Sequence, residues 1–117
     1  SEEQSGNAPR PSPGMLDRHY APRAPLHLVQ AAEEAAGLAA ATRARGGRVG
    51  LLTFRAPALD ADEIVLLPAE PEGYARELYR ALHRLDEAGV ALILAVCPPA
   101  GERWDAVRDR LGRGAHS

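Results

Sequence analysis

From residue 26 onward, short apolar runs alternate with longer segments in which apolar and polar residues are mixed. The apolar runs occupy residues 26–29, 48–54, 63–68 and 90–97, and each has the length of a β-strand. In the last three runs, apolar residues follow one another instead of alternating with polar ones. Continuous runs are typical of strands covered on both faces, as in parallel sheets. We therefore predict four strands, the last three of them buried on both faces.

Three of the mixed segments have the pattern of helices. Residues 31–45 carry acidic residues in the first turn and arginines in the last, as the helix dipole favours, and two glycines follow. Residues 71–88 begin with proline and repeat apolar residues along one face at helical spacing. Residues 102–111 place three apolar residues on one face. The order β-α-β-β-α-β-α predicts an α/β fold with a mostly parallel sheet of about four strands covered by helices.

The pattern leaves the order of the strands in the sheet open. The second and third predicted strands are joined by a short segment without a helical pattern. These two strands are therefore either antiparallel neighbours or parallel strands joined by a crossing loop without a helix.

Residues 1–25 differ from the rest of the chain, because they hold five of its ten prolines. Proline breaks helices, and this segment has few apolar residues to bury. We therefore predict an extended N-terminal arm or linker over residues 1–25 and a single domain over residues 26–117.

The charged residues and the single cysteine exclude some classes of function and disfavour others. The chain has 117 residues and a net charge of −2, and all 14 of its basic residues are arginine. The absence of lysine excludes Schiff-base chemistry and a lysine-containing phosphate loop, and the near-neutral charge disfavours a dedicated nucleic-acid-binding domain. The single cysteine permits no internal disulfide, so a cytoplasmic location is the default expectation. No stretch of 18 apolar residues is present, so we expect no membrane span.

Few residues have the spacing of a catalytic or metal site. Neither a dinucleotide-binding glycine motif nor a pair of metal-ligating residues is found, so we predict no catalytic residue and no metal in this chain. Cys97 ends the last predicted strand, either as a nucleophile or as a small residue that completes a buried strand. Arg76, Arg80 and Arg84 form a stripe along one helix, which is either a solvated face or a surface for a partner or phosphate.

The densest group of chemically active side chains lies in the predicted arm. Residues 12–22 read SPGMLDRHYAP and contain Arg18, His19 and Tyr20 in succession. Arginine binds phosphate oxygens in a bidentate fashion, and histidine and tyrosine can stack or donate hydrogen bonds. These residues alternatively belong to a linker whose large side chains pack on a neighbouring surface.

This segment resembles the interdomain linker of the long, two-domain form of L-threonylcarbamoyladenylate synthase, which commonly reads SPGMKYRHYAP. Nine of its eleven residues match, whereas Leu16 and Asp17 replace the usual lysine and tyrosine. Residues 75–99 are similar to part of the C-terminal domain of that family, and residues 104–115 are similar to its closing helix. The resemblance extends over the chain from about residue 12.

The resemblance implies a function for the complete enzyme. That enzyme joins ATP, L-threonine and bicarbonate into threonylcarbamoyl-AMP, which serves N6-threonylcarbamoyladenosine modification of tRNA. Catalysis belongs to an N-terminal YrdC-like domain that these residues do not contain. The C-terminal domain is implied to be Rossmann-like and regulatory, with Arg18, His19 and Tyr20 closing over the nucleotide. No cofactor is implied for this chain, and ATP with a divalent cation is implied for the full enzyme.

Partners and alternatives follow from the same residues. The implied partner is the YrdC-like domain of the same enzyme, with tRNA-modification proteins and tRNA as further contacts. One alternative is a free-standing small α/β domain that binds a nucleotide or another ligand near Cys97 and Phe54. The other is an interaction module of a tRNA-modifying assembly, with Arg76, Arg80 and Arg84 as its contact surface.

Overall fold

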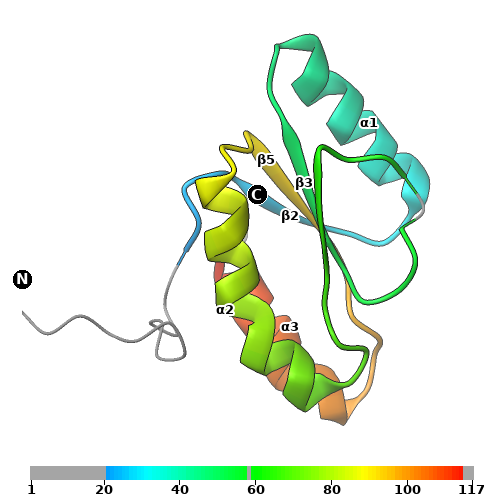
Figure 1. Ribbon diagram of the computed structural model, residues 1–117. Helices are drawn as coiled ribbons and strands as arrows, with labels where there is room; N and C mark the ends of the chain where they lie inside the picture. The colour runs from blue at the N-terminus through cyan, green and yellow to red at the C-terminus, as the bar shows by residue number, and fades with distance from the viewer. Residues whose placement is uncertain (1–20, 58, 115–117) are drawn as a thin grey trace, which may run out of the picture.

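The described part of the chain folds around one parallel β-sheet (Figure 1). The computed structural model describes residues 21–57 and 59–114. Within these residues the sheet has four strands in the order β2-β5-β3-β4. The predicted α/β class with a mostly parallel sheet is confirmed. The strands are β2 (Leu26–Val29), β3 (Val49–Thr53), β4 (Glu63–Leu66) and β5 (Leu92–Val96).

The second and third strands are parallel neighbours, which settles the alternative that the sequence left open. β3 pairs with β4 so that Leu51 lies opposite Ile64, and the connection between them contains no described helix. Asp62 stabilises the end of this connection, because its carboxylate accepts a hydrogen bond of 2.7 Å from the backbone N–H of Val49. That hydrogen bond lowers the pKa of Asp62, and the positive charges of Arg43 and Arg48 lower it further.

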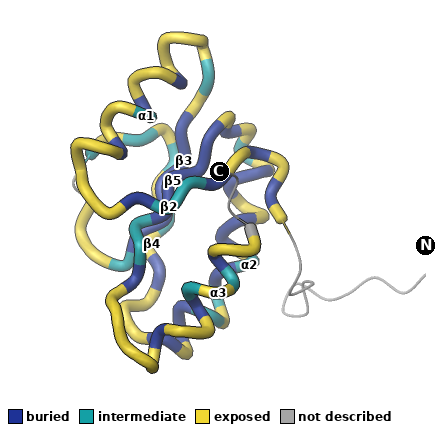
Figure 2. The backbone as a smooth tube through the Cα atoms, turned by 180° about the vertical axis from the view of Figure 1, so that it is seen from behind, coloured by how far each residue is buried: buried dark blue, intermediate teal, exposed yellow. Residues whose placement is uncertain are grey.

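Helices cover both faces of the sheet, which makes three layers (Figures 1 and 2). One face carries α1 (Ala32–Ala44). The other face carries α2 (Pro71–Glu87) and α3 (Asp105–Gly114), and a 3-10 turn, η2 (Glu102–Trp104), leads into α3. Glu70 caps α2 by accepting a hydrogen bond from the backbone N–H of Gly73 at 2.5 Å.

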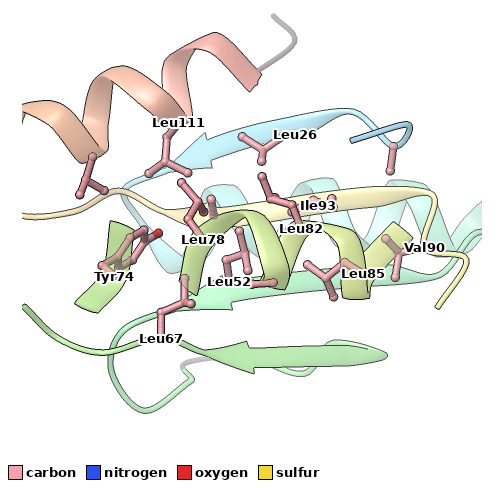
Figure 3. Close-up of a cluster of buried hydrophobic side chains, with 14 of the residues drawn as sticks. Leu26, Leu52, Leu67, Tyr74, Leu78, Leu82, Leu85, Val90, Ile93 and Leu111 are labelled. Carbon is pink, nitrogen blue, oxygen red and sulfur yellow. The ribbon is translucent and has the colours of Figure 1, made fainter. Parts of the chain in front are cut away.

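The larger core lies between the sheet and helices α2 and α3 (Figure 3). Leu78, Leu82 and Leu85 of α2 are at most 3% exposed and pack on Leu52 and Ile93 of the sheet. The smaller core under α1 uses Ala35 and Ala39, so that helix approaches the sheet through small side chains. Gly50 permits close approach of α2, since a Cβ there would lie 3.0 Å from Cδ2 of Leu85.

The prediction that the run at residues 63–68 is buried on both faces is wrong. β4 is the edge strand, and its residues alternate between half-buried and exposed. Leu66 is 64% exposed and Ile64 is 37% exposed. The cause is that α1 packs over β2, β5 and β3, which leaves the same face of β4 outside its reach.

The chain is fixed to α2 just before β2 begins. Asp86 of α2 is only 8% exposed. Its carboxylate accepts hydrogen bonds from the backbone N–H of Arg23 at 3.0 and 3.1 Å, and from that of Ala24 at 3.4 Å. The last residues of the predicted arm are therefore attached to the domain, and the predicted boundary after residue 25 stays a prediction.

Candidate functional site

A crevice opens where the carboxyl ends of β2 and β5 meet. β2 is followed by α1 on one face of the sheet, whereas the neighbouring β5 is followed by α3 on the other. Ligands of open parallel sheets bind at such a change of direction, because the diverging loops leave space between them. The crevice has a volume of about 360 Å³ and is lined by Gln30, Cys97, Pro98, Ala100 and Arg108.

Arg108, the arginine that lines this crevice, is hydrogen-bonded to the loop beside it. Arg108 donates hydrogen bonds to the carbonyl oxygens of Pro99 at 2.5 Å and Gly101 at 3.4 Å, and it also pairs with Asp105. Its guanidinium therefore holds the connection between β5 and α3. Sequence analysis did not single out Arg108, because the loop that it braces is recognisable only in three dimensions.

The remaining polar side chains of the crevice do not form a catalytic pair. Cys97 is half-buried, and its backbone N–H donates to the carbonyl of Val29 at 2.9 Å. None of the residues that line the crevice is a carboxylate or an imidazole that could act as a base for its thiol. The described residues of this crevice can accommodate a small molecule, with the Gln30 amide and the Cys97 thiol as its polar contacts.

Three aromatic rings lie behind the crevice, between the sheet and helices α2 and α3. Tyr74 and Trp104 meet edge to face with centroids 5.6 Å apart, and Phe54 lies 6.0 Å from Trp104 and 6.5 Å from Tyr74. The guanidinium of Arg55 lies 5.4 Å from the centre of the Phe54 ring, a cation–π contact. This cluster fills the end of the core with rigid apolar surface.

The hydroxyl of Tyr74 is buried without a hydrogen-bond partner in the described part of the chain (Figure 3). Burial, with a smaller effect of the nearby Cys97, raises the pKa of this phenol. The folded state therefore favours the neutral form. In the unfolded chain the Tyr74 phenol ionises above pH 10, whereas in the folded chain it stays neutral to a higher pH. The free energy of unfolding therefore falls as the pH rises beyond 10.

Replacing Tyr74 by phenylalanine removes this unpaired hydroxyl and keeps the ring. We expect the free energy of unfolding of Tyr74→Phe at pH 7 to be unchanged or up to about 1 kcal/mol higher, since no hydrogen bond is lost. Between pH 10 and 11 the variant should lose less stability than the wild type. Urea unfolding from pH 7 to pH 11 measures both effects, and a variant clearly less stable at pH 7 would show that the hydroxyl has a partner.

The structure describes only some of the predicted site residues. Arg76, Arg80 and Arg84 lie exposed on α2, as a contact surface or a solvated face would. The predicted nucleotide-gating residues Arg18, His19 and Tyr20 lie outside the described residues. Both roles therefore stay predictions.

A groove beside the arginine stripe was not predicted. It has a volume of about 330 Å³ and runs between β4 and α2. Its strand side consists of Val65, Leu66, Leu67 and Pro68, and its helix side of Glu77, Arg80, Ala81 and Arg84. No local sequence signal marks it, because it exists only where an edge strand and a helix lie side by side.

The anchoring role of Asp86 was also missed, although a signal was present. Asp86 lies four residues after Leu82 and eight after Leu78, and therefore on the apolar stripe of its helix. A carboxylate on a buried face needs a partner. That partner is the backbone of Arg23 and Ala24, more than sixty residues earlier in the chain.

The described residues contain neither a cluster of metal ligands nor a membrane-spanning helix. Residues 21–57 and 59–114 contain no group of three histidine, cysteine, aspartate or glutamate side chains placed to hold a metal ion. No helix in that part of the chain is both long and apolar enough to cross a membrane.

Comparison with known proteins agrees with the predicted resemblance. Residues 1–116 match the family described as the C-terminal domain of threonylcarbamoyl-AMP synthase. The chain is 36% identical over 89 residues to threonylcarbamoyl-AMP synthase of Pyrococcus abyssi, a match that covers 72% of this chain and 26% of the relative. The chain thus spans about a quarter of the length of that curated relative.

Solved structures show the same fold. The structure of Pyrococcus abyssi Sua5 complexed with L-threonine has a TM-score of 0.69 and 33% identity, covering 87% of this chain and 31% of that one. A Pyrococcus abyssi Sua5 variant with a histidine and the following tyrosine replaced by alanine has a TM-score of 0.67 and 29% identity, covering 80% and 28%. The C-terminal Sua5 domain of a hypothetical Pyrococcus horikoshii protein has a TM-score of 0.62 and 29% identity, covering 79% and 93%. The chain therefore belongs to the family of threonylcarbamoyl-AMP synthase C-terminal domains.

Proposed function

We propose that this chain is the regulatory domain and gating linker of a threonylcarbamoyl-AMP synthase. In this proposal the complete enzyme makes threonylcarbamoyl-AMP from ATP, L-threonine and bicarbonate for N6-threonylcarbamoyladenosine modification of tRNA, and this chain is not catalytic by itself. The observation that carries the proposal is the attachment of the arm to the domain. The buried Asp86 carboxylate binds the backbone N–H of Arg23, three residues after the end of the Arg18-His19-Tyr20 segment.

This attachment limits where the gating residues can act. Arg18 precedes Arg23 by five residues, so an extended chain places the Cα of Arg18 at most about 18 Å from that of Arg23. In this proposal the nucleotide site lies within that distance, plus the length of the Arg18 side chain, of the Asp86 anchor. The contact to phosphate then rests on Arg18, because Leu16 replaces the lysine of the family and Asp17 would repel phosphate.

A solved structure of a relative supports a functional role for His19 and Tyr20. One solved Pyrococcus abyssi Sua5 structure carries alanine in place of a histidine and the tyrosine after it. In this chain the adjacent pair is His19 and Tyr20. We extend the proposal to these two residues as contacts to the nucleotide or pyrophosphate, with ATP and a divalent cation held by the catalytic domain.

Rescue in trans tests the proposal. The chain is added to a separately produced catalytic domain of the same enzyme, and pyrophosphate release that depends on threonine and bicarbonate is measured. We expect the chain to change the rate or the apparent ATP affinity, and the double variant Arg18→Ala, Tyr20→Ala to lose that effect. Arg10→Ala, in the same arm but outside the motif, is the matched control.

Two outcomes would contradict parts of the proposal. Pyrophosphate release by the chain alone would show that it is catalytic. An unchanged rate and ATP affinity, at concentrations where binding to the catalytic domain is saturated, would exclude a gating role for the arm.

The crevice beside Cys97 favours a second candidate function, the binding of a small ligand. Its position at the switch between β2 and β5 is where open parallel sheets bind small ligands. A nucleotide or amino acid that binds the chain alone in calorimetry, and no longer binds after Gln30→Ala, would support this ligand-binding alternative.

A further inference from the structure

The outer edge of β4 is mainly apolar and is not paired with another strand in the described part of the chain. Within the described residues β4 pairs only with β3. Natural edge strands are usually protected by charged residues, proline or bulges, which prevent another chain from pairing with them. The one charged residue of β4, Glu63, is engaged with Arg48 at 3.0 Å. Leu66, at 64% exposure, therefore lies on an edge that can accept another strand.

The groove beside this edge combines an apolar floor with a basic rim. Leu67 and Ala81 are 4% exposed and form the floor between β4 and α2. Arg80 on the rim pairs only loosely with Glu77, at 3.7 Å. Arg84 is exposed, and its guanidinium makes no ion pair or hydrogen bond with the described residues. The groove therefore suits a segment that carries both apolar and acidic side chains.

The charges of the groove argue against a second copy of this chain as the occupant. Pairing of two β4 edges around a two-fold axis would place the same surface patch on both sides of the interface. Arg80 and Arg84 would then face the arginines of the other copy, and like charges at close range repel. A partner with carboxylates at these positions gains charge-assisted hydrogen bonds instead.

The attachment of the arm to Asp86 holds the preceding part of the enzyme near the groove. Asp86, the anchor of Arg23, follows Arg84 by two residues and therefore lies on the opposite flank of the same turn of α2. One helix diameter, about 10 Å, separates the two flanks. Whatever precedes the arm is tethered close to the groove, which raises its effective concentration there to about the millimolar range.

We propose that the β4 edge and the adjoining groove dock the catalytic domain of the synthase. In this arrangement an extended, carboxylate-bearing segment of that domain adds to the free edge of β4. Its backbone pairs with β4, its apolar side chains cover Leu66, and its carboxylates bind Arg80 and Arg84. This inference rests on the proposed function and adds the surface through which the two domains meet.

Binding of the chain to the separately produced catalytic domain tests the inference, with calorimetry as the readout. We expect Leu66→Asp and Arg84→Glu each to weaken binding at least tenfold, and wild-type binding to weaken as salt rises. Leu66→Ile, which keeps the apolar surface, and Arg45→Glu, a charge reversal at the end of α1, should bind like the wild type. Circular dichroism verifies that each variant is folded.

The outcomes separate this inference from the proposed function. A catalytic domain that responds to the wild-type chain and binds Leu66→Asp and Arg84→Glu equally well overturns the docking surface alone. A catalytic domain that neither binds nor responds to the wild-type chain overturns both. A wild-type chain that sediments as a dimer and becomes monomeric on Leu66→Asp assigns the edge to a second copy and also overturns the inference.

Discussion

Replacing Trp104 by alanine should lower the free energy of unfolding by about 3–5 kcal/mol, a range typical of large aromatic side chains removed from a core. Trp104 is 7% exposed and contacts both Tyr74 and Phe54. It also ends the 3-10 turn η2 directly before α3, whose Val107 and Leu111 pack on the same core. Its loss opens a cavity and weakens the attachment of α3.

Urea unfolding followed by circular dichroism measures this effect, since the variant has no tryptophan left to report by fluorescence. Arg103→Ala is the matched control, because Arg103 is exposed on the same turn and should change stability by less than about 0.5 kcal/mol. A loss of less than 1 kcal/mol for Trp104→Ala would mean that the aromatic cluster contributes little to the fold. Because domains of this size are stable by about 5–15 kcal/mol, the variant should stay folded in the absence of urea and unfold at a lower urea concentration than the wild type.

Replacing Asp86 by alanine should lower the free energy of unfolding by about 2–3 kcal/mol, because hydrogen bonds to a buried charged group are among the strong ones. The change leaves the backbone N–H groups of Arg23 and Ala24 without their carboxylate acceptor. The effect should be largest locally, at the junction between the arm and β2. Asp86→Asn keeps an acceptor oxygen and should lose less.

Trypsin provides a local readout, since it cleaves after arginine and the bond between Arg23 and Ala24 lies at the anchor. We expect faster cleavage at this bond in Asp86→Ala under conditions where the rest of the domain stays folded. Asp109→Ala removes an exposed carboxylate paired with Arg113 at 2.7 Å and should leave both cleavage and stability nearly unchanged. Unchanged cleavage at Arg23 in Asp86→Ala would show that other contacts hold the junction.

The proposed gating by the arm and the proposed docking at the groove both depend on this anchor. If Asp86 positions the arm, then Asp86→Ala should weaken rescue in trans even though neither Arg18 nor Tyr20 is altered. The conservative Asp86→Asn variant should retain more of the effect. The two variants therefore distinguish a role of the anchor in positioning the arm from a general loss of folded protein, which circular dichroism measures separately.

Local patterns predicted the elements well, because each depends on residues close in sequence. The apolar period of α2, its proline at the start and Gly89 after its end are all observed, the last with φ of +76°. The expected helix at residues 102–111 differs in its first turn, which is the 3-10 turn η2, and α3 extends to Gly114. The linker motif pointed to the family, and the comparisons confirm it.

Other features are long-range and have no local signature. The apolar run of β4 looks like that of β3, yet β3 is central and β4 is the edge, because strand order follows from how the crossing connections pack. The crevice near Cys97 likewise exists because β2 and β5 are neighbours with helices on opposite faces. Both facts require contacts between residues far apart in the chain.

The α/β class, the strand and helix segments and the family can be predicted from the sequence, since periodicity, helix ends and a linker motif involve neighbouring residues. The strand order β2-β5-β3-β4, the exposure of Leu66 and the hydrogen bonds of Asp86 to the arm are known only from the folded chain. They cannot be predicted locally because burial and hydrogen-bond partners depend on which distant segments meet. The identity of an apolar residue such as Leu66 does not show whether a helix will cover it in the fold.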